Sequence, residues 1–186
     1  MGTRGKRKIK SDYNEEAQQK ASLVLLRSAS DLRKLGEQKD CYKSLALDVE
    51  KLVQFIPDVR LEYVDMDSTL SGSLSKQDNI WLIRINKTHS KTRQRFSIAH
   101  ELGHFVYHKD DEKEFVDTTF FRGLISDNLE YTANKFASEL LMPEEQVRQL
   151  IDKENVRSVA DLAAKFGVSS AAMLYRVKEL KYKTIE

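Results

Sequence analysis

The sequence predicts an α+β fold that is mostly helical, with a small antiparallel sheet and a helical tail at the C-terminus. Apolar residues recur at every third or fourth position through most of the chain, which is the spacing of amphipathic helices. Strand-like patterns are confined to residues 59–86, between two helical stretches, and we expect those strands to pair antiparallel.

Length and composition restrict the class of protein. The chain has 186 residues, of which 40% are hydrophobic and 32% charged, values typical of one globular domain with at most a small appendage. No apolar run approaches the ~20 residues that a membrane span requires, and no hydrophobic segment follows the basic start as in a signal peptide. The one cysteine, Cys41, excludes an internal disulfide framework. We therefore expect a cytoplasmic protein that does not enter a membrane.

Residues 1–12 are expected to form a basic, flexible tail. Five cations and no acid fall within the first ten residues, in a chain whose formal net charge is +2. Such a tail could contact nucleic acid through its positive charge. We favour a solubilising chain end, because the first residues of most domains are poorly ordered.

Residues 13–56 are expected to form a scaffold of two helices. Apolar residues follow helical spacing from Glu15 to Leu35, and the polar stretch Gly36–Asp40 is expected to end this first helix. The second helix is expected to run through Leu45–Val53 and to stop at Pro57.

Residues 59–86 are expected to form the sheet. Val59–Val64 alternates apolar and charged residues, as a half-buried strand does, and Asn79–Asn86 is the clearest strand of the chain. Between them, the turn-rich stretch Asp65–Lys76 contains a short strand around Leu70–Leu74. An exposed edge of this sheet could pair with an extended peptide. A sheet that only contributes to the core explains the pattern equally well.

Residues 92–108 are expected to form the helix that carries the chemistry, because they contain His-Glu-x-x-His. Residues four apart lie on one face of a helix, so His100 and His104 can bind the same ion. Zinc bound in this way lowers the pKa of water toward ~7, and the Glu101 carboxylate is placed to take the proton. Gly103 costs a helix interior ~1 kcal/mol relative to alanine and indicates that a second element approaches closely. The alternative is a surface helix whose histidines are only solvated. The apolar stripe of this helix argues against that alternative, because it indicates that the helix is packed.

Two side chains that precede the HExxH motif, His89 and Arg93, are candidates for substrate contact. A cation or an imidazole beside the ion could stabilise an oxyanion. Ordinary surface charges are the simpler explanation of each, and the spacing fixes neither distance to the site.

The third metal ligand is expected to come from another element. His108 lies two turns, or ~12 Å, along the helix from His100, which one ion cannot bridge. A helix over residues 128–141 places Glu130 and Asn134 on one face, together with alanines that would allow close packing on Gly103. Glu130 is then the best-placed carboxylate, and Asn134 could orient a ligand imidazole. A capping box formed by Asp127 and Glu130 would explain Glu130 without a metal.

Two blocks of the chain resemble the ImmA/IrrE family of zinc metallopeptidases. The first block is Arg93–His104 and the second is Glu130–Pro143. The resemblance runs from about Asp65 and includes Ser71-Gly72 and the strand end at Ile85-Asn86.

The resemblance implies a zincin-like fold for residues 13–143, with zinc on His100, His104 and Glu130 and with Glu101 as the general base. It also implies a biological role, since members of this family are commonly encoded beside a helix-turn-helix repressor that they cleave or inactivate. The residues Tyr131-Thr132 differ from the acidic and alanine-rich sequence that is usual in the family at this point, without an evident effect on the chemistry.

Residues 144–186 are expected to form a helical subdomain that resembles a helix-turn-helix. Pro143 and two acids begin one helix, Ser158 caps the next, and Gly167 and Ser169 fall at the turn. The residues that would face DNA bases are small (Ser170, Ala171 and Ala172), although Lys165, Arg176 and Lys178 could contact phosphates. We therefore favour packing or partner docking over DNA binding.

The function that these patterns favour is a zinc-dependent endopeptidase that acts on a protein, with a helix-turn-helix repressor or antitoxin as the expected substrate. Manganese remains an alternative to zinc, because carboxylate ligation suits both ions. Two other functions stay open. The chain could be a DNA- or repressor-binding regulator whose zinc fold is only a scaffold, or a toxin that acts on a host protein.

Overall fold

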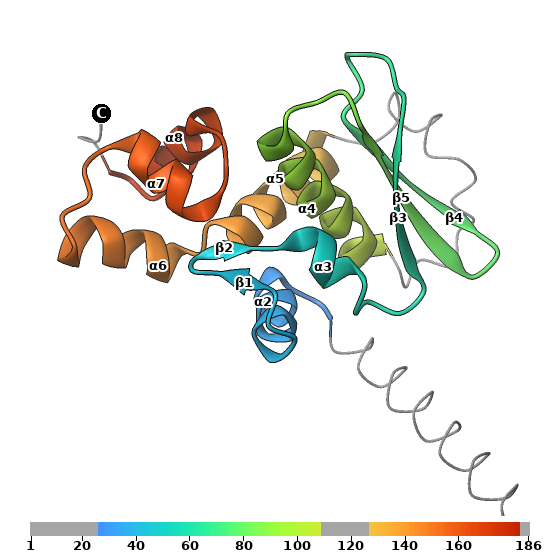
Figure 1. Ribbon diagram of the computed structural model, residues 1–186, viewed down its shortest axis with the longest axis horizontal. Helices are drawn as coiled ribbons and strands as arrows, with labels where there is room; N and C mark the ends of the chain where they lie inside the picture. The colour runs from blue at the N-terminus through green and yellow to red at the C-terminus, as the bar shows by residue number, and fades with distance from the viewer. Residues whose placement is uncertain (1–25, 109–126, 183–186) are drawn as a thin grey trace, which may run out of the picture.

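The computed structural model describes residues 26–108 and 127–182. The basic tail expected over residues 1–12 lies outside the described residues, as does the first part of the helix expected from Glu15 to Leu35. Helices α4 (Lys91–His108) and α5 (Asp127–Leu141) lie in the middle of the molecule (Figure 1). The sheet lies on one side of them, and the C-terminal helices lie on the other.

The N-terminal scaffold differs from the prediction in two ways. The first helix, α2 (Ala29–Gln38), begins only at Ala29 with Ser28 as its N-cap, and it ends within the polar stretch Gly36–Asp40 as predicted. Its Gly36 packs so close to Leu47 that an added Cβ would lie 2.8 Å from the Leu47 Cδ1. The expected second helix does not begin at Leu45. Strands β1 (Tyr42–Lys43) and β2 (Ala46–Leu47) form a short hairpin there, and helix α3 (Val49–Val53) follows with Asp48 as its N-cap.

The sheet contains three strands in the order β3 (Val59–Val64), β5 (Ile80–Asn86) and β4 (Gly72–Gln77). The expected antiparallel pairing is confirmed for β4 and β5, but β3 lies parallel to β5. The reason is the connection after β3, which carries the chain past the position of β5 to the far edge before the chain turns back. Among the described strands, β4 therefore forms the edge that runs beside α4.

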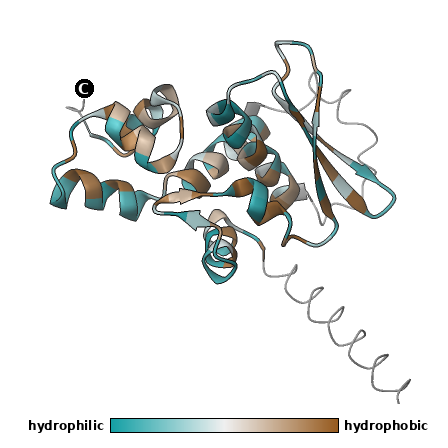
Figure 2. Ribbon diagram, viewed as in Figure 1, coloured by the Kyte–Doolittle hydropathy of each residue, from teal (hydrophilic) through white to brown (hydrophobic). Residues whose placement is uncertain are grey.

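The buried side chains form one continuous core that extends from Leu26 to Leu180. Figure 2 shows the apolar residues of the helices on the surfaces that face one another. On α4, Ile98 and Leu102 are fully buried, and the ring of Phe105 meets that of Trp81 on β5 edge to face, with 5.8 Å between centroids. The apolar stripe of α4 is therefore packed against the sheet, as its periodicity predicted.

The C-terminal segment contains α6 (Glu144–Arg148), a π-helical turn η2 (Gln149–Lys153), α7 (Val159–Phe166) and α8 (Ser170–Glu179). The predicted turn is confirmed. Gly167 ends α7 in the left-handed conformation with φ of 63°, and the Ser169 hydroxyl caps α8 by accepting the Ala172 N–H. Within the part of the chain that the structure describes, no helix is long and apolar enough to cross a membrane.

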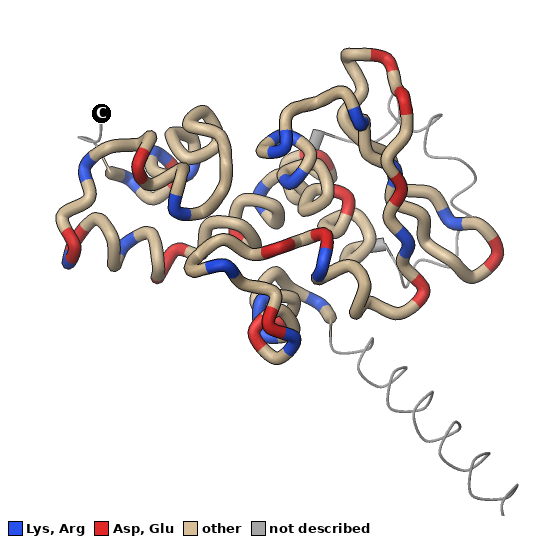
Figure 3. Tube along the Cα trace, in the orientation of Figure 1, with Lys and Arg blue, Asp and Glu red and all other residues tan. Residues whose placement is uncertain are grey.

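One predicted phosphate contact is wrong. Arg176 is 3% exposed, because its guanidinium donates to the Met142 carbonyl oxygen at 3.0 Å and pairs with Glu179 at 2.7 Å. Figure 3 shows Lys and Arg interspersed with Asp and Glu along α6, α7 and α8. This charge distribution does not resemble the basic face by which DNA-binding helices approach phosphates.

Candidate metal centre

Helix α4 presents the three motif residues toward the edge of the sheet. The side chains of His100 and His104 are only 16% and 11% exposed, and Glu101 is buried. The helix is anchored at its start, because the Gln94 side chain donates to the main-chain carbonyls of Asn86 and Lys87 at the end of β5. The motif therefore lies on a helix whose position relative to the sheet is fixed.

Helix α5 approaches α4 at Gly103. A Cβ added to Gly103 would lie 3.2 Å from the Ala133 Cα and 3.2 Å from the Phe136 side chain. Such distances are tighter than ordinary side-chain contact, so only glycine lets the two helices pack this closely. The expectation that Gly103 marks the approach of a second element is confirmed, and that element carries Glu130.

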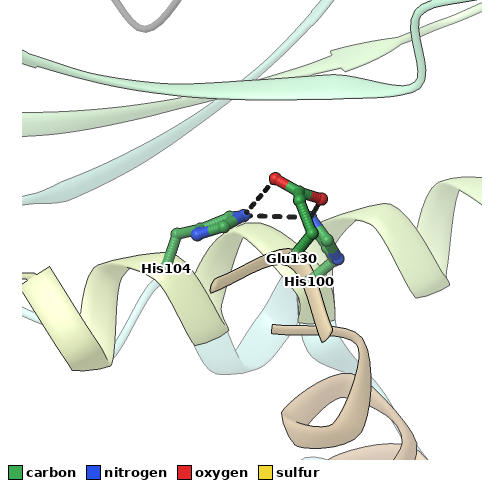
Figure 4. Close-up of side chains that lie close together, drawn as sticks. All are labelled: His100, His104 and Glu130. Carbon is green, nitrogen blue, oxygen red and sulfur yellow. Dashed lines mark hydrogen bonds and ion pairs between the residues drawn. The ribbon is translucent and has the colours of Figure 1, made fainter. Parts of the chain in front are cut away.

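His100, His104 and Glu130 come together at the crossing of these helices (Figure 4). The two Nε2 atoms are 3.1 Å apart. The Glu130 carboxylate offers one oxygen to each imidazole, with Oε2 3.4 Å from His100 Nε2 and Oε1 3.4 Å from His104 Nε2. Glu130 thus faces the histidines, as its ligand interpretation requires and as a capping box alone would not.

These distances fit a single divalent ion. Ligand atoms bound to zinc at ~2.0–2.1 Å in a tetrahedral arrangement lie about 3.3 Å from one another. Each of the three separations, 3.1, 3.4 and 3.4 Å, lies close to that value. Among the described residues, this is the only group of three His, Cys, Asp or Glu side chains gathered tightly enough to hold a metal.

A hydrogen bond defines which nitrogen of His100 faces the cluster. His100 Nδ1 lies 3.1 Å from Oδ1 of Asn134, one turn after Glu130 on α5. Because an amide oxygen only accepts, Nδ1 carries the proton, and Nε2 keeps the lone pair that a metal needs. Asn134 thus lies where an orienting partner was predicted.

The electrostatic environment favours positive charge. Burial is the largest single influence on His100 and lowers the pKa of its imidazole, but hydrogen bonds with Glu130 and Asn134 and the negative charges of Glu130 and Glu101 raise it. The net effect is a raised pKa for His100, so the carboxylates outweigh the cost of burying a cation here. The same carboxylates would stabilise a bound divalent ion.

Glu101 is not one of the three clustered residues, and its carboxylate lies against the edge strand. A Cβ built on Gly72 at the start of β4 would lie 3.1 Å from Glu101 Oε1. Sequence patterns singled out Ser71-Gly72 only through the family resemblance. A glycine inside a strand is itself a signal that another group approaches the backbone, and here that group is Glu101.

The other predicted site residues, His89 before α4 and Arg93 on it, contact the connection between β3 and β4. His89 Nε2 is 3.1 Å from the Ser68 carbonyl oxygen, and the Arg93 guanidinium donates to the Ser71 hydroxyl. Glu139, another carboxylate on α5, lies 3.9 Å from Lys135 and outside the cluster. Of the predicted set, the structure therefore brings together His100, His104, Glu130 and Asn134.

Comparison with known proteins gives a consistent result. The IrrE N-terminal-like domain matches residues 56–178. The radiation response metalloprotease IrrE of Deinococcus radiodurans is 27% identical over 135 residues, which cover 71% of this chain and 40% of the relative. The metallopeptidase ImmA of Bacillus subtilis is 30% identical over 105 residues, which cover 56% of this chain and 60% of the relative. The chain thus spans at most 60% of the length of these two relatives.

Proposed function

The chain belongs to the ImmA/IrrE family of metallopeptidases, and from that membership we propose that it is a zinc-dependent endopeptidase that cleaves a protein substrate. The observation that carries this proposal is the convergence of His100, His104 and Glu130 at mutual distances of 3.1–3.4 Å. Two imidazoles and one carboxylate are the ligand set of many catalytic zinc sites, in which the fourth position stays open. This mixed set favours zinc over manganese, which prefers oxygen ligands.

Each residue then has a defined task in peptide hydrolysis. His100, His104 and Glu130 would hold the ion, and Asn134 would keep the His100 ring in its ligating orientation. When bound, the ion supplies Lewis acidity, which polarises the scissile carbonyl and makes water more acidic. Glu101 accepts a proton from the water whose oxygen attacks the carbonyl carbon. It then donates that proton to the amine nitrogen as the C–N bond breaks.

The edge strand β4 would align the substrate. It pairs with β5 on one side only among the described strands, and its first residue, Gly72, lies beside Glu101. An extended peptide that adds to this edge through main-chain hydrogen bonds would pass directly beside the general base. Such pairing reads the backbone of the substrate and so suits a segment without fixed secondary structure.

The substrate that we propose is a helix-turn-helix repressor or antitoxin encoded nearby, and family membership supports this choice. DNA binding by α7 and α8 is less well supported, because Arg176 is buried and Ser170, Ala171 and Ala172 offer little to read bases. The single cysteine, Cys41, supports a cytoplasmic location for the reaction.

The test is direct cleavage of the repressor encoded beside this chain. The purified protein, loaded with zinc, is incubated with that repressor, and fragments are identified by mass spectrometry. We expect fragments with zinc and none after treatment with a chelator, with activity restored when zinc is added back. A repressor that stays intact, but whose operator DNA is shifted by this chain alone, would support a binding function instead.

A further inference from the structure

We propose that Arg93 is a positioning residue that fixes the Gly72 main chain against Glu101 by holding the preceding residue, Ser71. This inference rests on the proposed peptidase function, because it concerns the placement of the general base. It assigns Arg93 a task that differs from the oxyanion contact which the sequence suggested. The relevant segment is the strap, which we define as residues 65–71, between β3 and β4.

The first step is the contact between Gly72 and Glu101. A Cβ at Gly72 would lie 3.0 Å from Ile85 Cδ1, 3.1 Å from Glu101 Oε1 and 3.2 Å from the Arg84 carbonyl oxygen. The space in which a side chain would lie at Gly72 is thus filled by these three groups, one of which is the carboxylate of the general base. A small displacement of β4 at this point would change the space in which Glu101 works.

The second step is the contact that holds the residue before Gly72. Two N–H groups of the Arg93 guanidinium donate to the same Ser71 hydroxyl oxygen, Nη2 at 2.8 Å and Nε at 3.2 Å. Arg93 lies eight residues before Glu101 on α4, or ~12 Å along the helix axis. The arginine therefore joins the helix that carries the general base to the strap residue that precedes β4.

The third step is the rest of the strap, which is held independently of Arg93. The Asn86 side chain donates to the carbonyl oxygens of Leu70 at 2.9 Å and Asp67 at 3.1 Å, and its main-chain N–H donates to the Ser71 carbonyl at 3.1 Å. His89 contacts the Ser68 carbonyl. Loss of the Arg93 side chain should therefore leave the protein folded and remove one of the two ties at Ser71, because the Asn86 N–H still holds the Ser71 carbonyl oxygen.

The experiment is a double-mutant cycle with Arg93→Ala, Ser71→Ala and the double variant. If Arg93 acts only through Ser71, either single substitution already removes the whole contact. The kcat of the double variant should then be no lower than that of either single variant. We expect kcat for repressor cleavage to fall roughly tenfold to a hundredfold in all three, as small misplacements of catalytic groups do, with KM and bound zinc unchanged.

A second readout does not depend on activity. Hydrogen exchange of the main-chain amides in residues 71–74 should become faster in Arg93→Ala and in Ser71→Ala, with or without metal, because the strap end loses one of the two ties at Ser71. The matched control is Lys87→Ala, which removes the exposed 2.8 Å ion pair with Asp65 at the other end of the same strap. We expect this variant to keep the exchange rates and the kcat of the wild-type protein.

The outcomes separate the two proposals. Additive losses, or a strong effect of Arg93→Ala with a harmless Ser71→Ala, would show that Arg93 acts on the substrate and would overturn the positioning role. An Arg93→Ala variant with wild-type kcat and wild-type amide exchange would overturn it as well. A wild-type protein that binds zinc but does not cleave the repressor would instead count against the proposed function, while the exchange data would still decide whether Arg93 holds the strap.

Discussion

Arg95 on the metal helix donates from Nε to the carbonyl oxygen of Gly167 at 2.9 Å, although 72 positions separate the two residues in the chain. Its Nη2 also reaches the Phe166 carbonyl at 3.2 Å. These carbonyls lie at the C-terminal end of α7, where the helix dipole favours a cation. The contact joins the helix-turn-helix-like unit to α4, five residues before the first histidine of the metal centre.

This contact yields a prediction for Gly167→Ala. Gly167 has φ of 63°, a conformation that costs a residue with a Cβ ~1–2 kcal/mol, and the new Cβ would lie 3.4 Å from Arg95 Nη2. We expect the free energy of unfolding, measured by urea denaturation, to fall by ~1–2 kcal/mol. Gly167→Asn is the matched control and should lose less, because asparagine tolerates the left-handed region. Equal stability of the alanine variant and the wild type would contradict this account.

A second prediction concerns Glu130→Ala. This variant should lose most of its bound zinc, because two imidazoles alone leave the ligand set incomplete. It should stay folded, since the Glu130 side chain is 45% exposed and the core face of α5 is unchanged. Metal content is measured by elemental analysis after dialysis, and circular dichroism reports the fold. Glu139→Ala, which removes a 41% exposed carboxylate from the same helix, is the control and should keep its zinc.

A third prediction concerns Glu101→Gln. Glutamine keeps the shape of glutamate but cannot accept the proton, so cleavage should fall by ~10²–10⁴-fold. The zinc content should stay at the wild-type level, because Glu101 lies outside the three-residue cluster. Rates are measured with the repressor fragment assay under single-turnover conditions. Full activity of this variant would rule out Glu101 as the general base.

The helices that carry the site could be predicted closely from the sequence. Residues 92–108 and 128–141 were expected, and Lys91–His108 and Asp127–Leu141 are found. Long amphipathic helices repeat their signal over several turns, so their spacing outweighs local ambiguity. Helix geometry alone predicts that His100 and His104 share one face and that Gly103 marks a close approach. Helix spacing alone could not assign Glu130 as a ligand, because a capping box with Asp127 explains a glutamate at this position as well.

The N-terminal scaffold was harder to predict because its turns contain unusual residues. The left-handed residue that follows α2 is Asp40, with φ of 52°, and the hairpin between β1 and β2 turns at Ser44, with φ of 56°. Glycine is the usual residue for such positions, so the sequence around Ser44 carries no local sign of the hairpin. The parallel pairing of β3 with β5 and the tie between Arg93 and Ser71 arise from tertiary contacts, which no local spacing encodes.

The closest contact between the ligand helices leads to a prediction for Gly103→Ala. The added Cβ would lie 3.2 Å from the Ala133 Cα, a main-chain atom that can retreat only if α5 moves and carries Glu130 with it. Alanine gains ~1 kcal/mol in helix propensity, whereas overpacking costs ~1–3 kcal/mol, so stability should change little or fall. Zinc affinity should fall roughly tenfold, as it does when the groups that place a ligand are disturbed.

Competition with a chromophoric chelator measures the zinc affinity of this variant. Ser97→Ala on the same helix is the control, because it improves helix propensity and removes an atom from a side chain that bonds only to the Arg93 carbonyl of its own helix. It should bind zinc as the wild-type protein does. If Gly103→Ala also kept its full affinity and became more stable, the close packing of α4 on α5 would not be what places Glu130 beside the histidines.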